Sequence, residues 1–174
     1  MQILPYALLG LIALVMLVVG IFLITGLAGA PYVPTLKEPL EDALTKLYKI
    51  SSKDLLIDLG AGDGVVLKAA SKKGAKAVGV ELNPILALII KWRFRKDRQV
   101  TVKCRNFYHF KFPKETTVVY VFMIGLRMDG IYRKIQKEAT RLNKPIYLIS
   151  NAFDVSFAKP EKHISQFYLY KVEP

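Results

Sequence analysis

The chain has 174 residues, which is enough for one domain with a substantial core and some attached segments. It carries 26 Lys and Arg residues against 14 Asp and Glu residues, and the resulting formal charge of +12 favours an anionic partner such as a membrane surface or a nucleic acid. A single cysteine, Cys104, excludes an intrachain disulfide and a cysteine-rich zinc site.

The first 36 residues contain no charged side chain, and residues 3–30 are almost entirely apolar. A helix that crosses a bilayer needs about 20 apolar residues, so the sequence predicts a transmembrane anchor over residues 1–30. A cleaved secretory signal is the alternative, because residues 28–30 read "AGA". The missing basic n-region, the long apolar run and Pro31 just after the cut oppose that alternative. Lysines follow the segment and none precedes it, which predicts that the rest of the chain lies on the cytoplasmic or matrix-like side.

Residues 31–53 are expected to form a proline-punctuated connector with a short amphipathic helix over about 40–48. From 54 to 174, segments typical of strands alternate with segments typical of helices. The expected strands are 55–60, 75–82, 100–104, 116–124, 145–151 and a final one over 163–172, and the expected helices are 64–74, 84–96 and 129–142. The predicted fold is α/β: a doubly wound, mostly parallel, Rossmann-like sheet with an antiparallel final strand, preceded by one transmembrane helix.

A glycine-rich turn, "DLGAGDG", follows the first expected strand, and its glycines are Gly60, Gly62 and Gly64. A dinucleotide fingerprint would need glycine where the chain has Val65. Asp58 and Asp63 flank the place where a pyrophosphate would lie, and like charges so close repel. S-adenosylmethionine presents an ammonium and a sulfonium instead of a phosphate, so the two carboxylates favour it as the cofactor.

Four further residues and one in the connector complete the predicted cofactor site. Glu81 ends the second expected strand, where an acidic side chain can accept hydrogen bonds from ribose hydroxyls, and Leu82 follows it. Asn106 and Phe107 follow the third strand, where an amide can read the edge of the adenine and a ring can cover its face. Thr35 of the connector is also predicted to bind the cofactor. For Asn106, a turn residue is the alternative.

Three motifs together carry a family resemblance: "PYVPT" at 31–35, "DLGAGDG" at 58–64 and "GVELNP" at 79–84. The chain resembles the class I, seven-strand S-adenosylmethionine-dependent methyltransferases. More narrowly, it resembles the membrane-anchored lysine methyltransferases that modify the adenine nucleotide translocase and the ATP synthase c-subunit. It departs from them at Val65, where the family tends to have an arginine, and at Ile85, where the family tends to have an aromatic residue.

The expected reaction is methyl transfer to a lysine of a membrane protein, with the ATP synthase c-subunit as the first guess. Such a transfer needs a dry pocket that disfavours the lysine ammonium, and Tyr32, Phe122 and Phe153 are candidates for its walls. His109 and His163 are interpreted as structural or solvated, so no catalytic residue is assigned, and no metal site is expected. A methyltransferase of a small lipid-phase molecule, such as a quinone precursor or a phospholipid amine, is one alternative. A non-catalytic binding module at the membrane is another.

The densest cluster of positive charge is "KWRFRKDR", residues 91–98. Three interpretations are open: a solvated helix face whose aromatic rings turn inward, contact with an anionic membrane surface, and nucleic-acid binding. The fourth expected strand ends in "VFMIGLRM" and lacks the N-P-P-Y type of motif, which argues against exocyclic DNA amines as substrate. Nucleic acid is therefore the least favoured partner.

Overall fold

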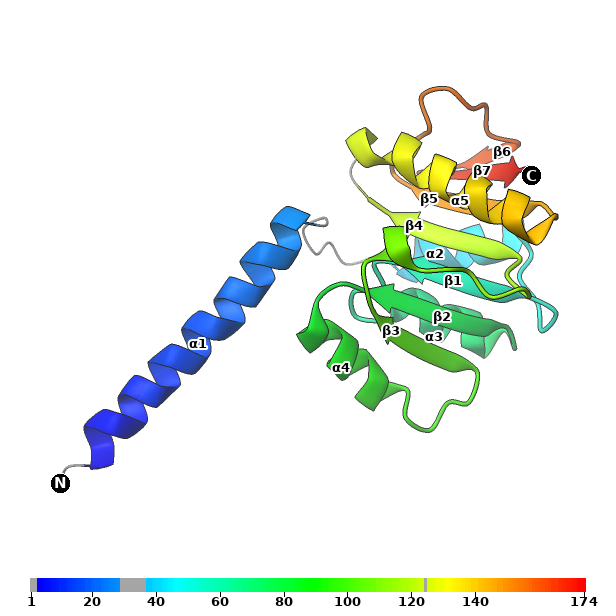
Figure 1. Cartoon of the computed structure of the whole chain (residues 1–174). Helices are drawn as coiled ribbons and strands as arrows, with labels where there is room; N and C mark the ends of the chain where they lie inside the picture. The colour runs from blue at the N-terminus through cyan, green and yellow to red at the C-terminus, as the bar shows by residue number, and fades with distance from the viewer. Residues whose placement is uncertain (1–2, 29–36, 124) are drawn as a thin grey trace. The chain divides into compact units, whose positions relative to one another are not determined.

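The structure, a computed structural model, describes residues 3–28, 37–123 and 125–174 (Figure 1). The chain divides into two compact units, Met1–Tyr32 and Val33–Pro174. The first contains helix α1 (Ile3–Ala28), whose 26 residues correspond to a length of about 39 Å at 1.5 Å per residue. Its stretch Tyr6–Ile24 is long and apolar enough to cross a membrane, and none of those residues is buried.

The second unit is built on a seven-stranded sheet. Its strands are β1 (Leu55–Leu59), β2 (Lys76–Glu81), β3 (Val100–Cys104), β4 (Val118–Phe122), β5 (Ile146–Asn151), β6 (Lys162–Ile164) and β7 (Phe167–Val172). They lie in the order β3-β2-β1-β4-β5-β7-β6. The pairs among β1 to β5 are parallel, and β7 runs antiparallel between β5 and β6. The predicted fold class is confirmed.

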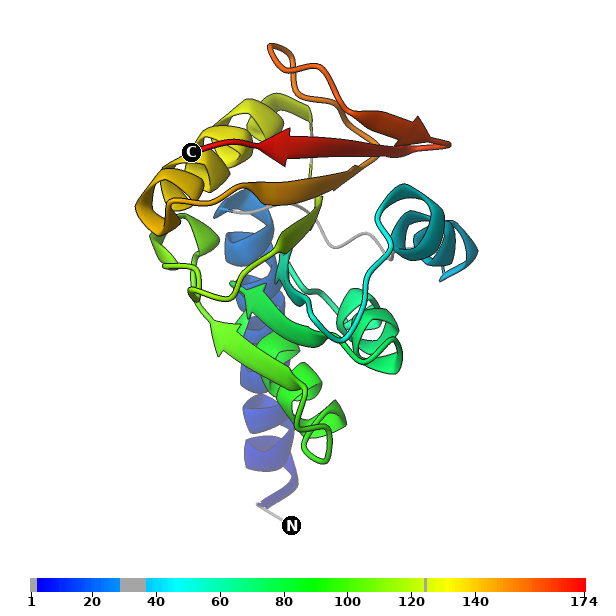
Figure 2. The same cartoon turned by 90° about the vertical axis from the view of Figure 1, so that its right-hand side faces the viewer.

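Helices cover both faces of the sheet. One face carries α2 (Lys37–Asp42), the π-helical turn η1 (Ala43–Leu47), α3 (Val65–Lys72) and α4 (Pro84–Arg93), whose apolar side chains share one core cluster. The other face carries α5 (Met128–Leu142), as Figure 2 shows. Short 3₁₀ turns, η2 (Phe107–His109) and η3 (Gly125–Arg127), follow β3 and β4.

The short helix expected over 40–48 is part of the domain core. Its apolar side chains Leu40, Leu44 and Leu47 are buried in the cluster that contains Leu56 of β1. The helix begins three residues earlier than expected and continues from α2 into η1. The segment that looked like a connector therefore contributes directly to the support of β1.

The single strand predicted over 163–172 is wrong. The structure has a hairpin, in which β6 and β7 pair antiparallel around Ser165 and Gln166. Ser165 has a φ of 53°, a left-handed conformation that fits a two-residue hairpin turn. Ser165 and Gln166 are adjacent polar residues, but the turn contains no Gly, Asn, Asp or Pro to mark it, so the pattern alone does not reveal it.

One of the three open interpretations of segment 91–98 has its aromatic rings turned inward, and this holds for only one of them. Phe94 is buried in the core cluster, whereas Trp92 is 67% exposed. The two rings lie two residues apart at the end of α4, about 200° around a helix, so they cannot both face the sheet.

A buried carboxylate connects α5 to the segment after β3. Glu138 accepts hydrogen bonds from Lys134 Nζ at 2.6 Å, from Arg141 Nε at 2.8 Å and from the backbone N–H of Phe112 at 3.2 Å. Burial alone would raise the pKa of Glu138, but the hydrogen bonds from Lys134, Arg141 and Phe112 lower it below its usual value. This network fixes the chain that continues from η2 against the sheet.

We expect Glu138→Gln to lower the free energy of unfolding at pH 7 by about 2 kcal/mol, the scale of charge-assisted hydrogen bonds. Because the folded-state pKa is lowered, the stabilisation is present above the pKa of the unfolded chain and is lost as pH falls through the folded value. Denaturant unfolding of both proteins between pH 7 and pH 3 measures this. Glu173→Gln, which removes an exposed ion pair with Lys171, is the control and should change little. A constant difference across the pH range would contradict the role of the Glu138 charge.

Candidate functional site

The site lies at the carboxyl ends of the parallel strands. The chain goes from β1 to β2 on one side and later returns to place β4 on the other side of β1. This reversal makes the carboxyl edge between β1 and β4 the topological switch point, where sheets of this kind bind ligands. The glycine-rich turn follows β1 at this edge.

The turn after β1 has a backbone that requires glycine. Gly60, Gly62 and Gly64 have φ values of 88°, 54° and 82°, all in the left-handed region. The N–H of Gly60 donates to the carbonyl of Val80 at 2.8 Å, which holds the turn against β2. A Cβ added at Gly60 would meet no atom within 4 Å, so this side of the turn faces open space.

Gly64 has a different role from Gly60. A Cβ added there would lie 2.8 Å from Cε2 of Phe94 and 3.1 Å from Cγ2 of Ile90. Gly64 therefore permits close packing between the start of α3 and the end of α4. This contact within the domain requires glycine at position 64, whether or not a ligand is bound.

Asp63 is held by the end of α4. The guanidinium of Arg93 donates to the backbone carbonyl of Asp63, and its Nη1 lies 4.0 Å from the Asp63 carboxylate. The N–H of Val65 donates to the other carboxylate oxygen of Asp63 at 3.3 Å. From the sequence, Asp63 was expected to favour a cationic ligand, and its contact with Arg93 was not identified because 30 residues separate the two.

Glu81 joins the turns that follow β1 and β2. Its carboxylate accepts hydrogen bonds from the backbone N–H of Gly62 at 2.9 Å and of Asn83 at 2.8 Å. The Asn83 side chain in turn caps α4 by accepting from the N–H of Ile85 at 2.9 Å. A carboxylate has about four lone-pair sites, so two remain for a ligand.

Asp58 is the most buried carboxylate at this edge, with 3% of its surface exposed. Burial, followed by the neighbouring carboxylates of Glu81 and Asp63, raises the pKa of Asp58 well above its usual value. Within the described part of the chain, no hydrogen bond reaches its side chain. Asp58, Glu81 and Asp63 therefore concentrate acidic groups at this edge of the sheet.

The predicted adenine-side residues lie where expected, after β2 and β3. Asn106 caps η2, because its side-chain oxygen accepts from the N–H of Tyr108 at 3.0 Å. Phe107 is buried, and its ring centroid is 4.4 Å from that of Tyr108. Leu82 is half-buried directly after Glu81. Asn106 therefore acts as a turn residue through its oxygen, which leaves its amide group for other contacts.

Two of the three predicted acceptor-side aromatics lie on neighbouring strands. Phe122 ends β4, and Phe153 follows β5 in a loop. Phe153 packs beside Gly125, where an added Cβ would lie 3.1 Å from the ring, and it is 40% exposed. Leu126, next to Gly125, is 97% exposed. Tyr32 and Thr35 lie outside the described residues.

A buried polar cluster near Phe122 was not predicted from the sequence. The Asn151 amide donates to the Tyr120 hydroxyl at 3.0 Å, and the Gln166 amide donates to the Asn151 carbonyl at 2.7 Å. Tyr120 pairs in register with Asp58, and Asn151 with Phe122. The sequence does show polar residues in strands that are buried. It does not show their hydrogen-bond partners, which come from distant parts of the chain.

The two histidines lie outside the buried part of the site. His109 is exposed at the end of η2, and the ring of exposed His163 stacks on Tyr168 at 4.4 Å. Among the described residues, no group of three or more His, Cys, Asp and Glu side chains could hold a metal ion.

Comparisons with known proteins find methyltransferases, among them several that act on lysine. The sequence model of the ANTKMT methyltransferase domain matches residues 58–162. The ATP synthase c-subunit lysine N-methyltransferase of Xenopus laevis is 34% identical over 115 residues, which are 62% of this chain and 48% of the relative. Protein-lysine N-methyltransferase of Saccharolobus islandicus is 29% identical over 139 residues, which are 77% of this chain and 83% of the relative.

Among solved structures, an RNA methyltransferase from Salinibacter ruber in complex with S-adenosyl-L-homocysteine has a TM-score of 0.72 at 23% identity. The match covers 81% of this chain and 94% of that chain, and it shows the shared fold. The chain spans about half the length of the Xenopus laevis relative. The family model covers more than half of this chain, from Asp58 in β1 to Lys162 in β6, and the chain belongs to the ANTKMT methyltransferase domain family.

Proposed function

We propose that the chain is a membrane-anchored, S-adenosylmethionine-dependent protein-lysine methyltransferase that acts on a membrane protein. The observation that carries this proposal is the buried Asp58 carboxylate with its raised pKa, at the start of a turn that faces open space. A cationic ligand compensates such a charge. Membership of a methyltransferase family and similarity to two named lysine methyltransferases support the reaction.

The residues at the carboxyl edge fit S-adenosylmethionine. The open side of Gly60 lets the ligand approach the backbone closely, and Asp58 pairs with its ammonium. The unused lone pairs of Glu81 accept from the ribose hydroxyls. Asn106 and Phe107, beside Leu82, take the adenine. Thr35 stays a prediction, since it lies outside the described residues.

A dinucleotide fits the same turn poorly. Its pyrophosphate would lie near Asp58 and Asp63, and the nearest cation, Arg93, is already held by Asp63. Neighbouring negative charges in a poorly solvated site repel strongly. The electrostatics of the turn therefore favour a cationic ligand over an anionic one.

S-adenosylmethionine supplies an electrophilic methyl group, which a neutral amine takes by direct displacement from the sulfonium. The main obstacle is the proton on the acceptor lysine, whose removal at pH 7 costs about 4 to 5 kcal/mol for a free pKa near 10.4. The rings of Phe122 and Phe153 flank the acceptor side and exclude water there, which disfavours the ammonium form. Tyr32 is the third wall in this proposal.

The exposed acceptor rim favours an apolar target. Leu126 is almost fully exposed in η3, and the ring of Phe153, which packs beside the neighbouring Gly125, is partly exposed in the loop after β5. A lysine next to a transmembrane segment presents this combination of an amine and an apolar neighbourhood. The ATP synthase c-subunit is the first candidate, because the Xenopus laevis relative bears that substrate in its name.

Helix α1 supplies the anchor in this proposal. Its apolar length suits a bilayer, and the first charged residue of the chain, Lys37, follows it. By the positive-inside rule, the domain lies on the cytoplasmic or matrix-like side. Tethering raises the effective concentration of a target in the same membrane.

Removing the Asp58 charge should separate stability from affinity. We expect Asp58→Asn to weaken S-adenosylmethionine binding by about 1.5 to 3 kcal/mol in calorimetry, through loss of a charge-assisted contact. The same variant should unfold at a higher temperature without ligand at pH 7. A carboxyl whose folded pKa is raised loses stability as pH rises from its unfolded pKa towards the folded value, and asparagine removes this cost. The Asp63 carboxylate already has protein partners, so Asp63→Asn should change affinity and unfolding temperature less. Unchanged affinity in Asp58→Asn would remove this residue from the site.

Glu81→Ala should weaken binding of both S-adenosylmethionine and S-adenosylhomocysteine by about 1 to 3 kcal/mol, because the ribose contacts are lost and the turn is no longer held. Glu81→Gln keeps one oxygen acceptor, so its affinity should lie between that of the wild-type protein and that of Glu81→Ala. Isothermal calorimetry measures both, with exposed Glu115→Ala as the control. Undiminished affinity in Glu81→Ala would contradict the assignment.

The reaction itself is tested with full-length protein, labelled S-adenosylmethionine and native membranes. We expect mass spectrometry to find new methyl groups on a lysine next to a transmembrane helix, and the initial rate to rise from about pH 7 towards pH 9 as free amine becomes available. Deleting Met1 to Ala30 should lower the rate on membranes far more than it lowers cofactor affinity. Label found only in extracted lipid would replace this proposal with a lipid-phase small-molecule substrate. Cofactor binding without any transfer would favour a non-catalytic module.

A further inference from the structure

The outer face of helix α4 is unusually apolar. Ala87, Ile90 and Phe94 face the core, as expected for a helix packed on a sheet. The opposite side should then be polar, because it faces water. Instead it exposes Leu88 at 68% and Trp92 at 67%.

These exposed side chains form one continuous surface, which we call the α4 patch and define as Leu88, Ile89 and Trp92. Leu88 and Ile89 lie four and three residues before Trp92, the two spacings at which helix side chains are neighbours. Ile89 is 44% exposed. The patch lies on the convex outer side of the helix, and a convex apolar surface can insert into the apolar part of a bilayer.

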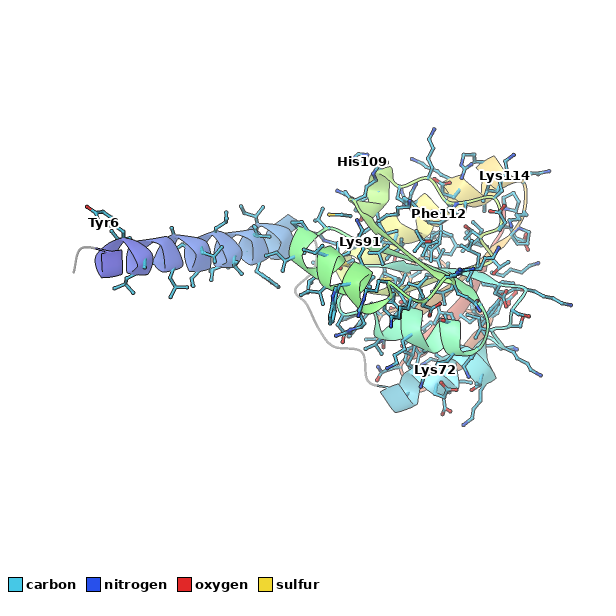
Figure 3. The ribbon with its side chains drawn as sticks, turned by 90° about the horizontal axis from the view of Figure 1, so that it is seen from below. Tyr6, Lys72, Lys91, His109, Phe112 and Lys114 are labelled. Carbon is cyan, nitrogen blue, oxygen red and sulfur yellow. The ribbon has the colours of Figure 1, made fainter. Side chains whose placement is uncertain are left out.

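Positive charge is concentrated at the C-terminal end of α4 and in the residues that follow it. Segment 91–98 holds five cations, Lys91, Arg93, Arg95, Lys96 and Arg98, and a single acid, Asp97. That acid is occupied, because its carboxylate accepts from the Ser71 hydroxyl at 2.5 Å and from the N–H of Gln99 at 2.9 Å. Figure 3 labels Lys91 on α4, and this side chain is exposed. Within the described residues, Lys91, Lys96 and Arg98 have no ion pair.

We infer that the α4 patch and its surrounding cations dock on an anionic phospholipid surface. Trp, Leu and Ile side chains bury at the boundary between headgroups and acyl chains, while Lys and Arg side chains pair with lipid phosphates. Each basic side chain near an anionic leaflet raises binding about fivefold. The membrane contact is thus a property of the folded domain, additional to the apolar helix α1.

A nucleic acid fits the same surface less well. Base stacking would use the face of Trp92, but the Arg95 guanidinium lies 4.5 Å from the centre of that ring and also donates to the Trp92 carbonyl at 2.8 Å. Leu88 and Ile89 offer no hydrogen bond to a base or a phosphate. Acyl chains suit these two side chains, and lipid phosphates suit the cations beside them.

Trp92 is the only tryptophan of the chain, so intrinsic tryptophan fluorescence reports on the α4 patch alone. The full chain is reconstituted in nanodiscs of phosphatidylcholine and in nanodiscs that also contain phosphatidylglycerol. We expect emission at shorter wavelength in the anionic discs, and quenching there by lipids brominated near the headgroup end of the acyl chain. High salt should reduce both effects, since it screens the cations.

A charge variant supplies the decisive comparison. Neutralising Lys91, Lys96 and Arg98 together to alanine should return the emission in anionic discs to its value in phosphatidylcholine. The matched control neutralises Lys114, Lys137 and Lys144, exposed or half-exposed cations near α5 and its ends, and should keep the shift. Equal emission in both lipids, or a response to added RNA without quenching by brominated lipid, would overturn the inference. The measurement involves no methyl transfer, so its failure is distinguishable from failure of the proposed function.

Discussion

The carboxyl edge of the sheet depends on one carboxylate that holds two turns. Glu81 accepts hydrogen bonds from the backbone N–H groups of Gly62 and Asn83, so the protein's own groups hold the turn after β1 to the turn after β2. Both turns also depend on their own local chemistry, left-handed glycines in the first and the asparagine cap of α4 in the second. The site is therefore preorganised, and little ordering of the backbone is left for ligand binding to accomplish.

In the proposed function, the charged residues bind the methyl donor and the exposed apolar surface contacts the target. Carboxylates gather on the β1 and β2 side of the edge, where a cationic donor would bind, whereas exposed apolar side chains lie in the loops after β4 and β5. In the proposed function, the burial of Asp58 lowers stability and favours a cationic ligand, a trade that is common at functional sites. Helix α1 and the α4 patch are proposed here as two independent means of holding the domain at a membrane.

Local sequence patterns predicted most of the fold, because each strand and helix carries its own signal. The apolar strands, the glycine turn and Pro84 at the start of α4 needed no knowledge of distant residues. The final hairpin was not predicted, since its turn at Ser165 and Gln166 contains none of the Gly, Asn, Asp or Pro residues that usually mark a tight turn. The orientation of Trp92 could not either, because α4 is apolar all round and periodicity does not identify its buried side.

For the site, the sequence predicted the acidic and glycine positions and failed where two distant segments meet. The contact of Arg93 with Asp63 and the cluster of Asn151, Tyr120 and Gln166 exist only in the folded chain. The packing of Gly64 against Phe94 is another contact between distant segments, and it limits which residues can replace either of them. A relative with a side chain at position 64 must have a smaller residue at position 94 or a displaced α4, so these two positions should covary across the family although neither needs to touch a substrate.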